Sequence, residues 1–477
     1  MPLSGEERLL LKTIYNRLDE NKPLKPEDPD YHEIYQPVYD HPGCDDPVEL
    51  MQTRIDFSNI ESVQLFSGFR GSGKTTELYR LKKRLEDEGY VVLYADALEY
   101  VSQSEEVDIS NLLIVLAGAF GDAMKEQLKI DVTGENYWTR FTNYLTRTTV
   151  SVSEATVKAE GDSPFKELIG GLKAGIDLKA SLKTSPSFRQ TMEKALANRI
   201  GELKDHVDKF IEDGVKAIRE KVKDQKGIVF LFDSLEQVRG TRLNEQSVIR
   251  SVERLFADYF PKMLRLPYVH AIYTVPPWLQ FSNPNITKIV IIPCVRQWHN
   301  DDGRSEYKDG CNALYSLVMR RFGEAGFKRF FGESAEPQNP LARRVLDHCG
   351  GHFRDLLYML REALLRAKSL PVLPEVIETA IAEMRGHFLP IAVEDARWLH
   401  QIANHRSAAL PDSGAESVNR LTKFLDTHFV LYFKNGDEWY DIHPLIREEV
   451  AEIIKNHTPS PGLVPVAPPS SAVPVTQ

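Results

Sequence analysis

The chain has 477 residues, of which 42% are hydrophobic and 27% charged. This composition is typical of a globular protein and excludes a disordered or fibrous one, and the length allows about three domains. Because 69 acidic residues outnumber 59 basic ones and give a net charge of −10, a protein whose main task is to bind nucleic-acid phosphates is disfavoured.

Three further absences limit the cellular setting. The longest apolar runs are no longer than a strand, so we expect no membrane span. The N-terminus has an acidic pair before a very short apolar patch, which does not resemble a signal peptide. The four cysteines contain no CxxC pair, which excludes a zinc ribbon and argues against a disulfide framework. We expect a cytoplasmic protein.

The first expected elements are a helix over residues 5–20 and, to residue 45, an extended arm rich in proline and tyrosine that lies on the next domain. Residues 46–100 then follow the order strand, glycine loop, helix, strand, a βαβ unit that implies a parallel sheet. Further strands are expected at 227–232, 269–275 and 288–293. We therefore predict a three-layer α/β domain over 46–300 with a five-stranded parallel sheet.

A long insertion, about 101–226, separates the second and third strands. Helical patterns cover residues 111–128 and 199–222. Between them, apolar and polar residues alternate, most strictly from 172 to 183, which indicates a β-hairpin within 148–183. Two interpretations of this hairpin remain open: an arm packed on its own domain, or an arm that docks a partner or a lipid surface.

The last third of the chain is expected to be mainly helical. Residues 301–385 are predicted to form a helical lid, and residues 386–456 a winged helix. In the latter, helices precede two strand-like runs separated by Asn435-Gly436, a strong hairpin signal. Residues 457–477 contain six prolines and are predicted to be a disordered tail.

The central motif is a glycine-rich loop that fits the pattern GxxxxGK[ST] and lies between an expected strand and an expected helix. Its glycines allow backbone N–H groups to surround a phosphate, and the helix N-terminus adds a positive dipole end. We expect Lys74 to reach the β- and γ-phosphates of ATP or ADP, and the Thr75 hydroxyl to bind Mg²⁺. The predicted nucleotide-binding residues of this P-loop are Gly68, Gly71, Ser72, Gly73, Lys74, Thr75 and Thr76.

Three candidate catalytic residues follow other expected strands. Asp233 ends the apolar run IVFLF, where an acid can hold Mg²⁺ through water. Glu236, three residues later, is a candidate for polarising the attacking water. Thr274 ends the fourth strand and is a candidate sensor of the γ-phosphate. The structural alternatives are a helix cap for Asp233, an exposed glutamate for Glu236 and a packing role for Thr274.

A fourth candidate lies in the predicted lid. In the segment Gly350-Gly351-His352-Phe353-Arg354-Asp355, a glycine turn precedes a helix. An arginine in the first turn of this helix can point back toward the nucleotide. Arg354 is therefore a candidate γ-phosphate contact, with an ordinary ion pair to Asp355 as the alternative.

Together, the P-loop, the Asp233–Glu236 strand end, the glycine turn and the winged helix resemble the AAA+/STAND class of P-loop ATPases over residues 46–456. The turn is similar to the lid "sensor 2" of initiator-type AAA+ proteins. The segment from Tyr440 to Arg447 is similar to one in STAND switches whose histidine holds the ADP β-phosphate, which implies that role for His443. The structural alternative for His443 is a cap at the start of the last helix.

The resemblance implies a bacterial ATPase that acts as a nucleotide-controlled switch, with slow, regulatory hydrolysis of ATP and with Mg²⁺ as cofactor. ADP would keep it closed, and ATP would allow assembly with a separate effector or sensor protein or with further copies of itself. Analogy with the class suggests antiphage defence or a related conflict system. The alternative is a DNA-binding initiator or loader that uses the winged helix, and a minor alternative is a P-loop kinase.

Overall fold

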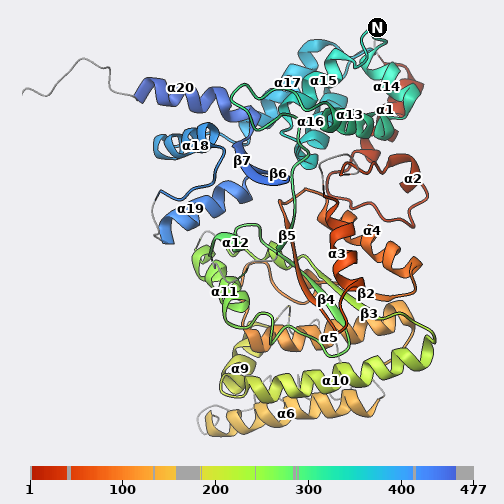
Figure 1. The fold of residues 1–477 in the computed structure, drawn as a ribbon, viewed down its shortest axis with the longest axis vertical. Helices are drawn as coiled ribbons and strands as arrows, with labels where there is room; N and C mark the ends of the chain where they lie inside the picture. The colour runs from red at the N-terminus through yellow and green to blue at the C-terminus, as the bar shows by residue number, and fades with distance from the viewer. Residues whose placement is uncertain are drawn as a thin grey trace, which may run out of the picture.

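A computed structural model describes residues 3–39, 45–132, 135–156, 183, 185–241, 243–282, 286, 289–411 and 415–457. At the centre lies a five-stranded parallel sheet in the order β2-β3-β4-β1-β5 (Figure 1). Its strands are β1 (Val63–Gly68), β2 (Val91–Asp96), β3 (Ile228–Asp233), β4 (His270–Val275) and β5 (Ile289–Ile292). The predicted α/β class and the five-stranded parallel sheet are confirmed.

The strands run parallel because the chain crosses back from one end of the sheet to the other between consecutive strands. All six residues of β3 are buried, as expected for a strand covered on both faces. Strand β4 lies between β3 and β1, with Val229 opposite His270 and Val63 opposite Ala271. The carboxyl ends of the strands therefore meet at one edge, where ligands bind in open α/β sheets.

Helices and single turns surround this sheet. Helix α4 packs against β2, and α3 packs against α4 and β5. The elements of this part of the chain are α1 (Gly5–Arg17), α2 (Tyr31–Ile34), α3 (Pro47–Asp56), α4 (Lys74–Asp87), η1 (Ala97–Glu99), η2 (Leu235–Gln237), α11 (Glu245–Asp258) and α12 (Leu279–Ser282).

The insertion between β2 and β3 contributes α5 (Ile109–Leu128), α6 (Asn136–Thr156), α9 (Pro186–Leu196) and α10 (Ile200–Lys221). Helix α5 packs against β2 and α10 against α5 and α6, so the insertion forms a helical layer at the bottom of Figure 1. The helices predicted at 111–128 and 199–222 are confirmed.

The predicted hairpin needs a correction. Residues 148–156 are helical and belong to α6, so no strand begins at residue 148. The physical reason is that Trp138, Phe141 and Leu145, all buried, set a helical stripe in the first part of this segment, and the helix continues past them. Most of the remaining span of the prediction, 157–182, lies outside the described residues.

The lid and the winged helix follow β5. The lid comprises α13 (Lys308–Phe322), α14 (Glu324–Phe331), α15 (Pro340–His348), α16 (Phe353–Arg366) and α17 (Pro374–Gly386). The winged helix comprises α18 (Val393–His405), α19 (Ala415–Asp426), β6 (Val430–Asn435), β7 (Asp437–Ile442), η3 (Pro444–Ile446) and α20 (Arg447–His457). Strands β6 and β7 pair antiparallel, as Asn435-Gly436 predicts. The predicted tail from residue 458 onward lies outside the described residues.

One short segment after β5 connects the sheet to both of these parts. The N–H of Cys294 donates to the carbonyl of Tyr432 in β6 at 2.9 Å, and the N–H of Val295 donates to the carbonyl of Gly351 at 3.0 Å. The wing and the glycine turn of the lid are therefore hydrogen-bonded to the same two linker residues. This arrangement positions the start of α16 above the P-loop.

Among the described residues, no helix combines the length and the apolar character that crossing a membrane requires.

Candidate nucleotide-binding site

The P-loop joins β1 to α4 and turns through glycines in the left-handed region. The φ angles of Gly71 and Gly73 are +90° and +87°, which residues with side chains rarely adopt. Helix α4 begins at Lys74 without a side-chain cap, so its first N–H groups face the loop. An uncapped helix N-terminus next to a glycine loop is a site for an anion such as phosphate.

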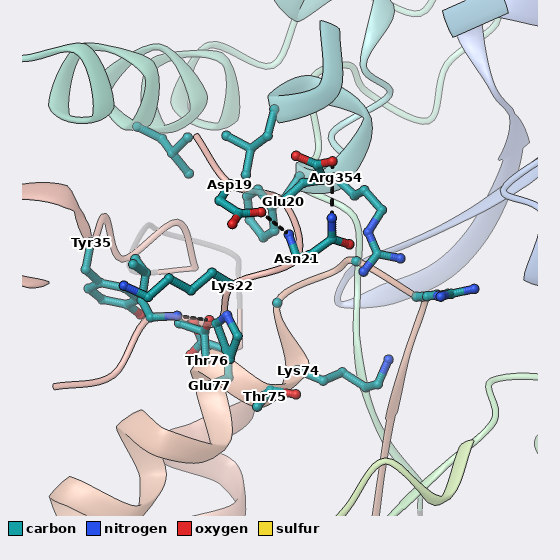
Figure 2. Close-up of a pocket in the computed structure, with 18 of the residues that line it drawn as sticks. Asp19, Glu20, Asn21, Lys22, Tyr35, Lys74, Thr75, Thr76, Glu77 and Arg354 are labelled. Atoms are coloured by element: carbon teal, nitrogen blue, oxygen red, sulfur yellow. Dashed lines mark hydrogen bonds between the residues drawn. The ribbon is translucent and has the colours of Figure 1, made fainter. Parts of the chain in front are cut away.

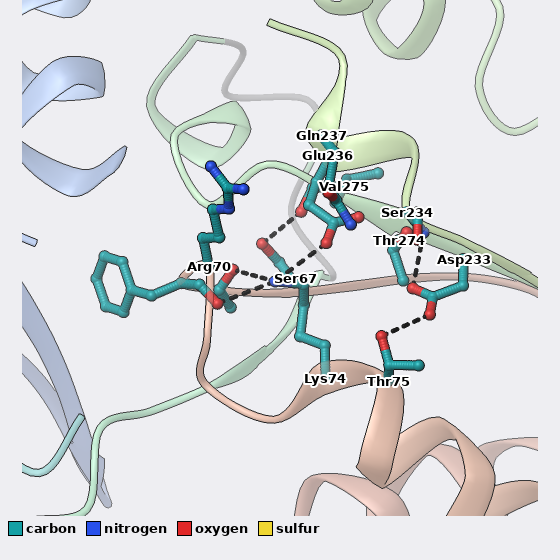
Figure 3. A network of polar contacts seen from close by, with 12 residues as sticks. Ser67, Arg70, Lys74, Thr75, Asp233, Ser234, Glu236, Gln237, Thr274 and Val275 are labelled. Carbon is teal, nitrogen blue, oxygen red and sulfur yellow. Dashed lines mark hydrogen bonds and ion pairs between the residues drawn. The ribbon is translucent and has the colours of Figure 1, made fainter. Parts of the chain in front are cut away.

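Lys74 is buried and makes three polar contacts at the base of the loop (Figure 3). Its ammonium group donates to the carbonyls of Gly68 and Phe69 at 2.9 and 3.0 Å. It also lies 3.1 Å from a carboxylate oxygen of Glu236. The lysine thus connects the phosphate loop with the glutamate predicted to activate water.

Asp233 lies at the carboxyl end of β3 and is fully buried. The Thr75 hydroxyl donates to its carboxylate at 2.8 Å, and the Tyr94 hydroxyl donates to the same oxygen at 2.9 Å. Burial, together with the neighbouring charge of Glu236, raises the pKa of Asp233 to about 6. The carboxylate is therefore destabilised at neutral pH as long as no cation lies beside it.

This pair of side chains fits Mg²⁺. A threonine hydroxyl and an aspartate carboxylate, 2.8 Å apart, supply the oxygen atoms that this ion prefers. The desolvated carboxylate gains a counter-charge when a divalent cation binds. Thr75 and Asp233 would hold the ion, which when bound supplies positive charge next to the nucleotide phosphates.

Thr274 lies on β4, between the strands that carry Asp233 and the P-loop. Its hydroxyl oxygen accepts a hydrogen bond from the N–H of Leu235 at 3.2 Å, and the side chain is buried. This bond orients η2, the turn that carries Glu236. Thr274 therefore positions Glu236 through the backbone of the preceding residue, Leu235.

The lid closes one side of the site, as Figure 2 shows for Arg354. The backbone N–H of Arg354 donates to the carbonyl of Gly71 at 3.3 Å. A Cβ atom at Gly71 would lie only 2.5 Å from the Cβ of Arg354, so the close approach of α16 to the loop requires glycine there. Asp355 turns away to a group of histidines, and Arg354 has no acidic partner within 4 Å among the described residues.

The cavity at this junction has a volume of about 310 Å³. Of the residues predicted from the sequence, the cavity is lined by Gly71, Gly73, Lys74, Thr75, Thr76, Glu236 and Arg354. Arg70 and Lys74 also contribute positive charge. Burial, followed by the charge of Arg70, lowers the pKa of Arg354. Three cationic side chains, Arg70, Lys74 and Arg354, around one cavity fit a polyanionic ligand.

The other predicted residues lie outside the cavity wall. Gly68 is the last residue of β1, and Ser72 is a buried residue of the loop. Asp233 and Thr274 are buried near the carboxyl ends of β3 and β4. His443 is buried and faces Asp355 at 3.3 Å. Its role as a contact for the β-phosphate stays a prediction.

The N-terminal arm supplies cavity residues that sequence reasoning did not single out. The N–H of Leu24 donates to the Thr76 hydroxyl at 3.1 Å, and the Tyr35 hydroxyl donates to Glu77 at 3.1 Å. Glu20 forms an ion pair with Arg361 of the lid. The composition of this segment, rich in proline and tyrosine, predicted that the arm lies on the next domain. It did not identify which residues reach the cavity.

Comparisons with known proteins add the following. No protein-family model matches the sequence, and no curated protein matches it either. Two solved structures of the ORC2 protein from Aeropyrum pernix, one with ADPNP and ADP and one with ADP, are similar at a TM-score of 0.38. They are 11% and 12% identical, cover 92% of this chain, and are covered over 96% and 97% of their own lengths. Cdc6p from Pyrobaculum aerophilum is similar at a TM-score of 0.30 and 11% identity, over 86% of this chain and 94% of its own.

The α/β domain has a P-loop NTPase fold, as its sheet order, its P-loop and the carboxylate at the end of β3 together show.

Proposed function

We propose that this chain is an ATP-binding ATPase of the AAA+/STAND type, in which the bound nucleotide controls the position of the lid and the winged helix. The observation that carries the proposal is the contact of Arg354 with the P-loop. This contact brings a lid arginine, Lys74 and the glycine loop into one cavity of about 310 Å³. A nucleotide in this cavity would contact the sheet domain and the lid together.

Three groups have distinct tasks in this proposal. The P-loop amides and Lys74 bind the phosphates. Glu236 pairs with Lys74 at 3.1 Å, and a nucleotide that draws the lysine away would leave Glu236 available to orient water. Arg354 adds positive charge from the lid side, where it stabilises charge that develops on the transferred phosphoryl group.

The proposed switch requires that the nucleotide site be coupled to the winged helix. Arg239 follows the turn that carries Glu236 and lies 3.3 Å from Asp426, the last residue of α19. The hydrolysis site is thereby adjacent to a contact between the sheet domain and the winged helix. A separate effector or sensor protein, or further copies of this chain, are the partners that an opened winged helix would meet. No feature of the described residues bears on antiphage defence, and the proposal does not extend to it.

A DNA-binding initiator is the second candidate. It is favoured by the winged-helix architecture, in which α19 occupies the place of a recognition helix. On α19, Arg420 is paired with Asp395 at 2.6 Å, whereas Lys423 is exposed. Two basic residues, one of them already paired, provide few phosphate contacts, so the switch is the function that we propose first.

The test is the molecular mass of the Glu236→Gln variant in solution, measured by light scattering with ADP, with ATP and Mg²⁺, and with each of these plus duplex DNA. The variant keeps a side chain of the same size and loses the carboxylate, so ATP should bind and persist. A defined oligomer with ATP alone supports the switch. A monomer that binds duplex only with ATP supports the initiator instead.

The matched control is Lys74→Ala in the same background. Under all conditions it should keep the molecular mass that the protein has without nucleotide. If neither ATP nor ADP binds the Glu236→Gln variant, the nucleotide-binding proposal itself is wrong.

A further inference from the structure

Three histidines surround one buried carboxylate at the junction of the P-loop, the lid and the winged helix. His352 and Asp355 lie at the start of α16, His428 follows α19, and His443 follows β7. Their side chains are 0%, 3%, 11% and 0% exposed, in that order. A buried carboxylate needs compensating positive charge or hydrogen bonds, so the protons of these rings decide what the cluster can bind.

The contacts of His352 define its protonation pattern. Its Nε2 atom lies 3.0 Å from the backbone carbonyl of Arg70. A carbonyl only accepts hydrogen bonds, so Nε2 carries the proton, and Nδ1 of the neutral ring has a lone pair. That lone pair lies 2.9 Å from a carboxylate oxygen of Asp355. In the neutral ring two acceptors face each other at this distance, and one cation between them, a proton on Nδ1 or a metal ion, satisfies both.

His428 supplies a third donor atom. Its Nδ1 lies 3.5 Å from the same oxygen of Asp355, and the three candidate ligand atoms are all within 4.8 Å of one another. In a tetrahedral zinc site with bonds of about 2.0–2.1 Å, neighbouring ligand atoms lie about 3.3 Å apart. The two distances to Asp355, 2.9 and 3.5 Å, lie on either side of that value.

The surrounding groups orient these ligands as in known metal sites. The Arg70 carbonyl fixes the ring of His352 through its other nitrogen. His443 accepts the N–H of Leu445 on Nδ1 at 3.2 Å, so its Nε2 carries the proton and faces Asp355 at 3.3 Å. One imidazole is thus held by a carbonyl, and the carboxylate is faced by an N–H group.

We propose that His352, Asp355 and His428 bind one divalent transition-metal ion of the zinc class, with a fourth position left for water. Imidazole nitrogens suit Zn²⁺, whereas Mg²⁺ prefers a set of oxygen ligands. The ion connects α16 of the lid with the segment after α19 of the winged helix. Through the Arg70 carbonyl it also fixes the back of the P-loop, so the bound metal stabilises the closed arrangement.

The test measures metal binding directly and does not depend on nucleotide. The full chain is dialysed against a chelator, titrated with ZnSO₄ in competition with a chromophoric chelator, and its metal content is measured by mass spectrometry. We expect one equivalent of Zn²⁺ in the wild type. His428→Ala and Asp355→Asn should each weaken binding at least about 10-fold, since each removes a ligand. His348→Ala is the control, because this lid histidine bonds to the Arg344 carbonyl of its own helix.

Because Asp355→Asn changes a buried group, the wild type provides an independent measurement. Co²⁺ in place of Zn²⁺ should give the intense visible absorption of a tetrahedral nitrogen and oxygen site, whereas weak octahedral bands would contradict the proposal. Equal Zn²⁺ affinity in all four proteins would also overturn it. So would a wild type that binds no Zn²⁺ and whose His352 ring nitrogens are both protonated by NMR, because a proton would then be the cation beside Asp355.

Discussion

Lys74 is a buried cation whose polar contacts, two loop carbonyls and Glu236, are all internal to the proposed site. Replacing it with alanine removes the charged group that faces the phosphates. A charge-assisted hydrogen bond is worth about 1.5–3 kcal/mol, so Lys74→Ala should weaken ADP binding by roughly 10- to 100-fold. Fluorescence titration with a labelled ADP measures this loss.

Lys82→Ala is the control for that measurement. Lys82 lies on the same helix, is partly buried, pairs with Glu86 and does not line the cavity. Its removal should leave the dissociation constant for ADP unchanged within about twofold, because it does not face the bound nucleotide. Equal affinity of the Lys74→Ala variant and the wild type would contradict the proposed role of the lysine.

Asp233 predicts a pH dependence of stability without nucleotide. Its pKa is raised from 3.8 to about 6 by burial and then by Glu236, so the folded state binds more protons than the unfolded state between these values. The free energy of unfolding should therefore fall as the pH rises from about 4 to about 6, by an amount on the order of 2 kcal/mol. Urea unfolding at several pH values measures this.

Asp233→Asn removes the titrating group and should abolish that decrease. The stability of the variant relative to the wild type should therefore increase as the pH rises. Asp87→Asn, on the exposed end of α4 and paired with Lys83, should leave the decrease in place. If the wild type instead becomes more stable across this pH range, the environment assigned to Asp233 is wrong.

The positions of the central site residues could be predicted because short motifs specify them locally. A glycine loop between a strand and a helix locates Lys74 and Thr75, and parallel strands bring Asp233 and Thr274 to the same edge. The cavity residues of the N-terminal arm, such as Tyr35, could not be predicted. Their position depends on how the arm, which holds the short helix α2, crosses to Glu77; this is a tertiary contact with no local pattern.

At the scale of elements, α6 shows where local patterns are ambiguous. Its later part, residues 148–156, contains threonine, valine and serine in alternation and favours strand by residue type. The preceding turns place Trp138, Phe141 and Leu145 on one buried face, against the helices of the insertion. Helix formation is cooperative, so a helix that is already packed extends into residues of weak preference. The sheet strands and the hairpin at Gly436 had no such competitor and could be predicted.

The glycine turn before α16 leads to an element-scale prediction. Gly351 has a φ of +73°, and a Cβ atom there would lie 1.9 Å from the carbonyl oxygen of Val295. Gly351→Ala must therefore displace the linker that is hydrogen-bonded to both lid and wing. We expect a loss of about 2–4 kcal/mol in stability and faster hydrogen exchange at the start of α16. Thermal unfolding and exchange mass spectrometry measure these changes.

Gly386→Ala provides the matched control at the end of α17. A Cβ atom at Gly386 would meet nothing within 4 Å, so the substitution should be neutral or slightly stabilising. If Gly351→Ala unfolds at the same temperature as Gly386→Ala, the turn does not constrain the lid as described.

At the scale of the whole molecule, the closed arrangement depends on contacts between residues far apart in the sequence. Arg361 of the lid binds Glu20 of the arm, and Arg239 of the sheet domain binds Asp426 of the winged helix. Helical patterns, the hairpin signal at Asn435-Gly436 and the resemblance to AAA+/STAND ATPases predicted a lid and a winged helix. Their placement could not be predicted, because single ion pairs and linker hydrogen bonds have no signature in local sequence.

The Arg239–Asp426 pair allows the coupling between the proposed hydrolysis site and the winged helix to be tested by exchanging charges. The two side chains are 30% and 17% exposed and lie 3.3 Å apart. Asp426→Arg places two cations opposite each other. The repulsion of about 1 kcal/mol should shift the population toward an open form by roughly fivefold. Small-angle X-ray scattering should then give a larger radius of gyration without nucleotide.

The double variant Arg239→Asp with Asp426→Arg restores opposite charges and should recover the compact form, which a merely destabilising substitution would not do. Asp395→Arg serves as the control, because it breaks the pair with Arg420 inside the winged helix and leaves the contact with the sheet domain intact. Opening in the single variant should also accelerate release of bound ADP, since Arg239 follows the turn that carries Glu236. Expansion in the double variant equal to that in Asp426→Arg would show that this ion pair does not hold the winged helix closed.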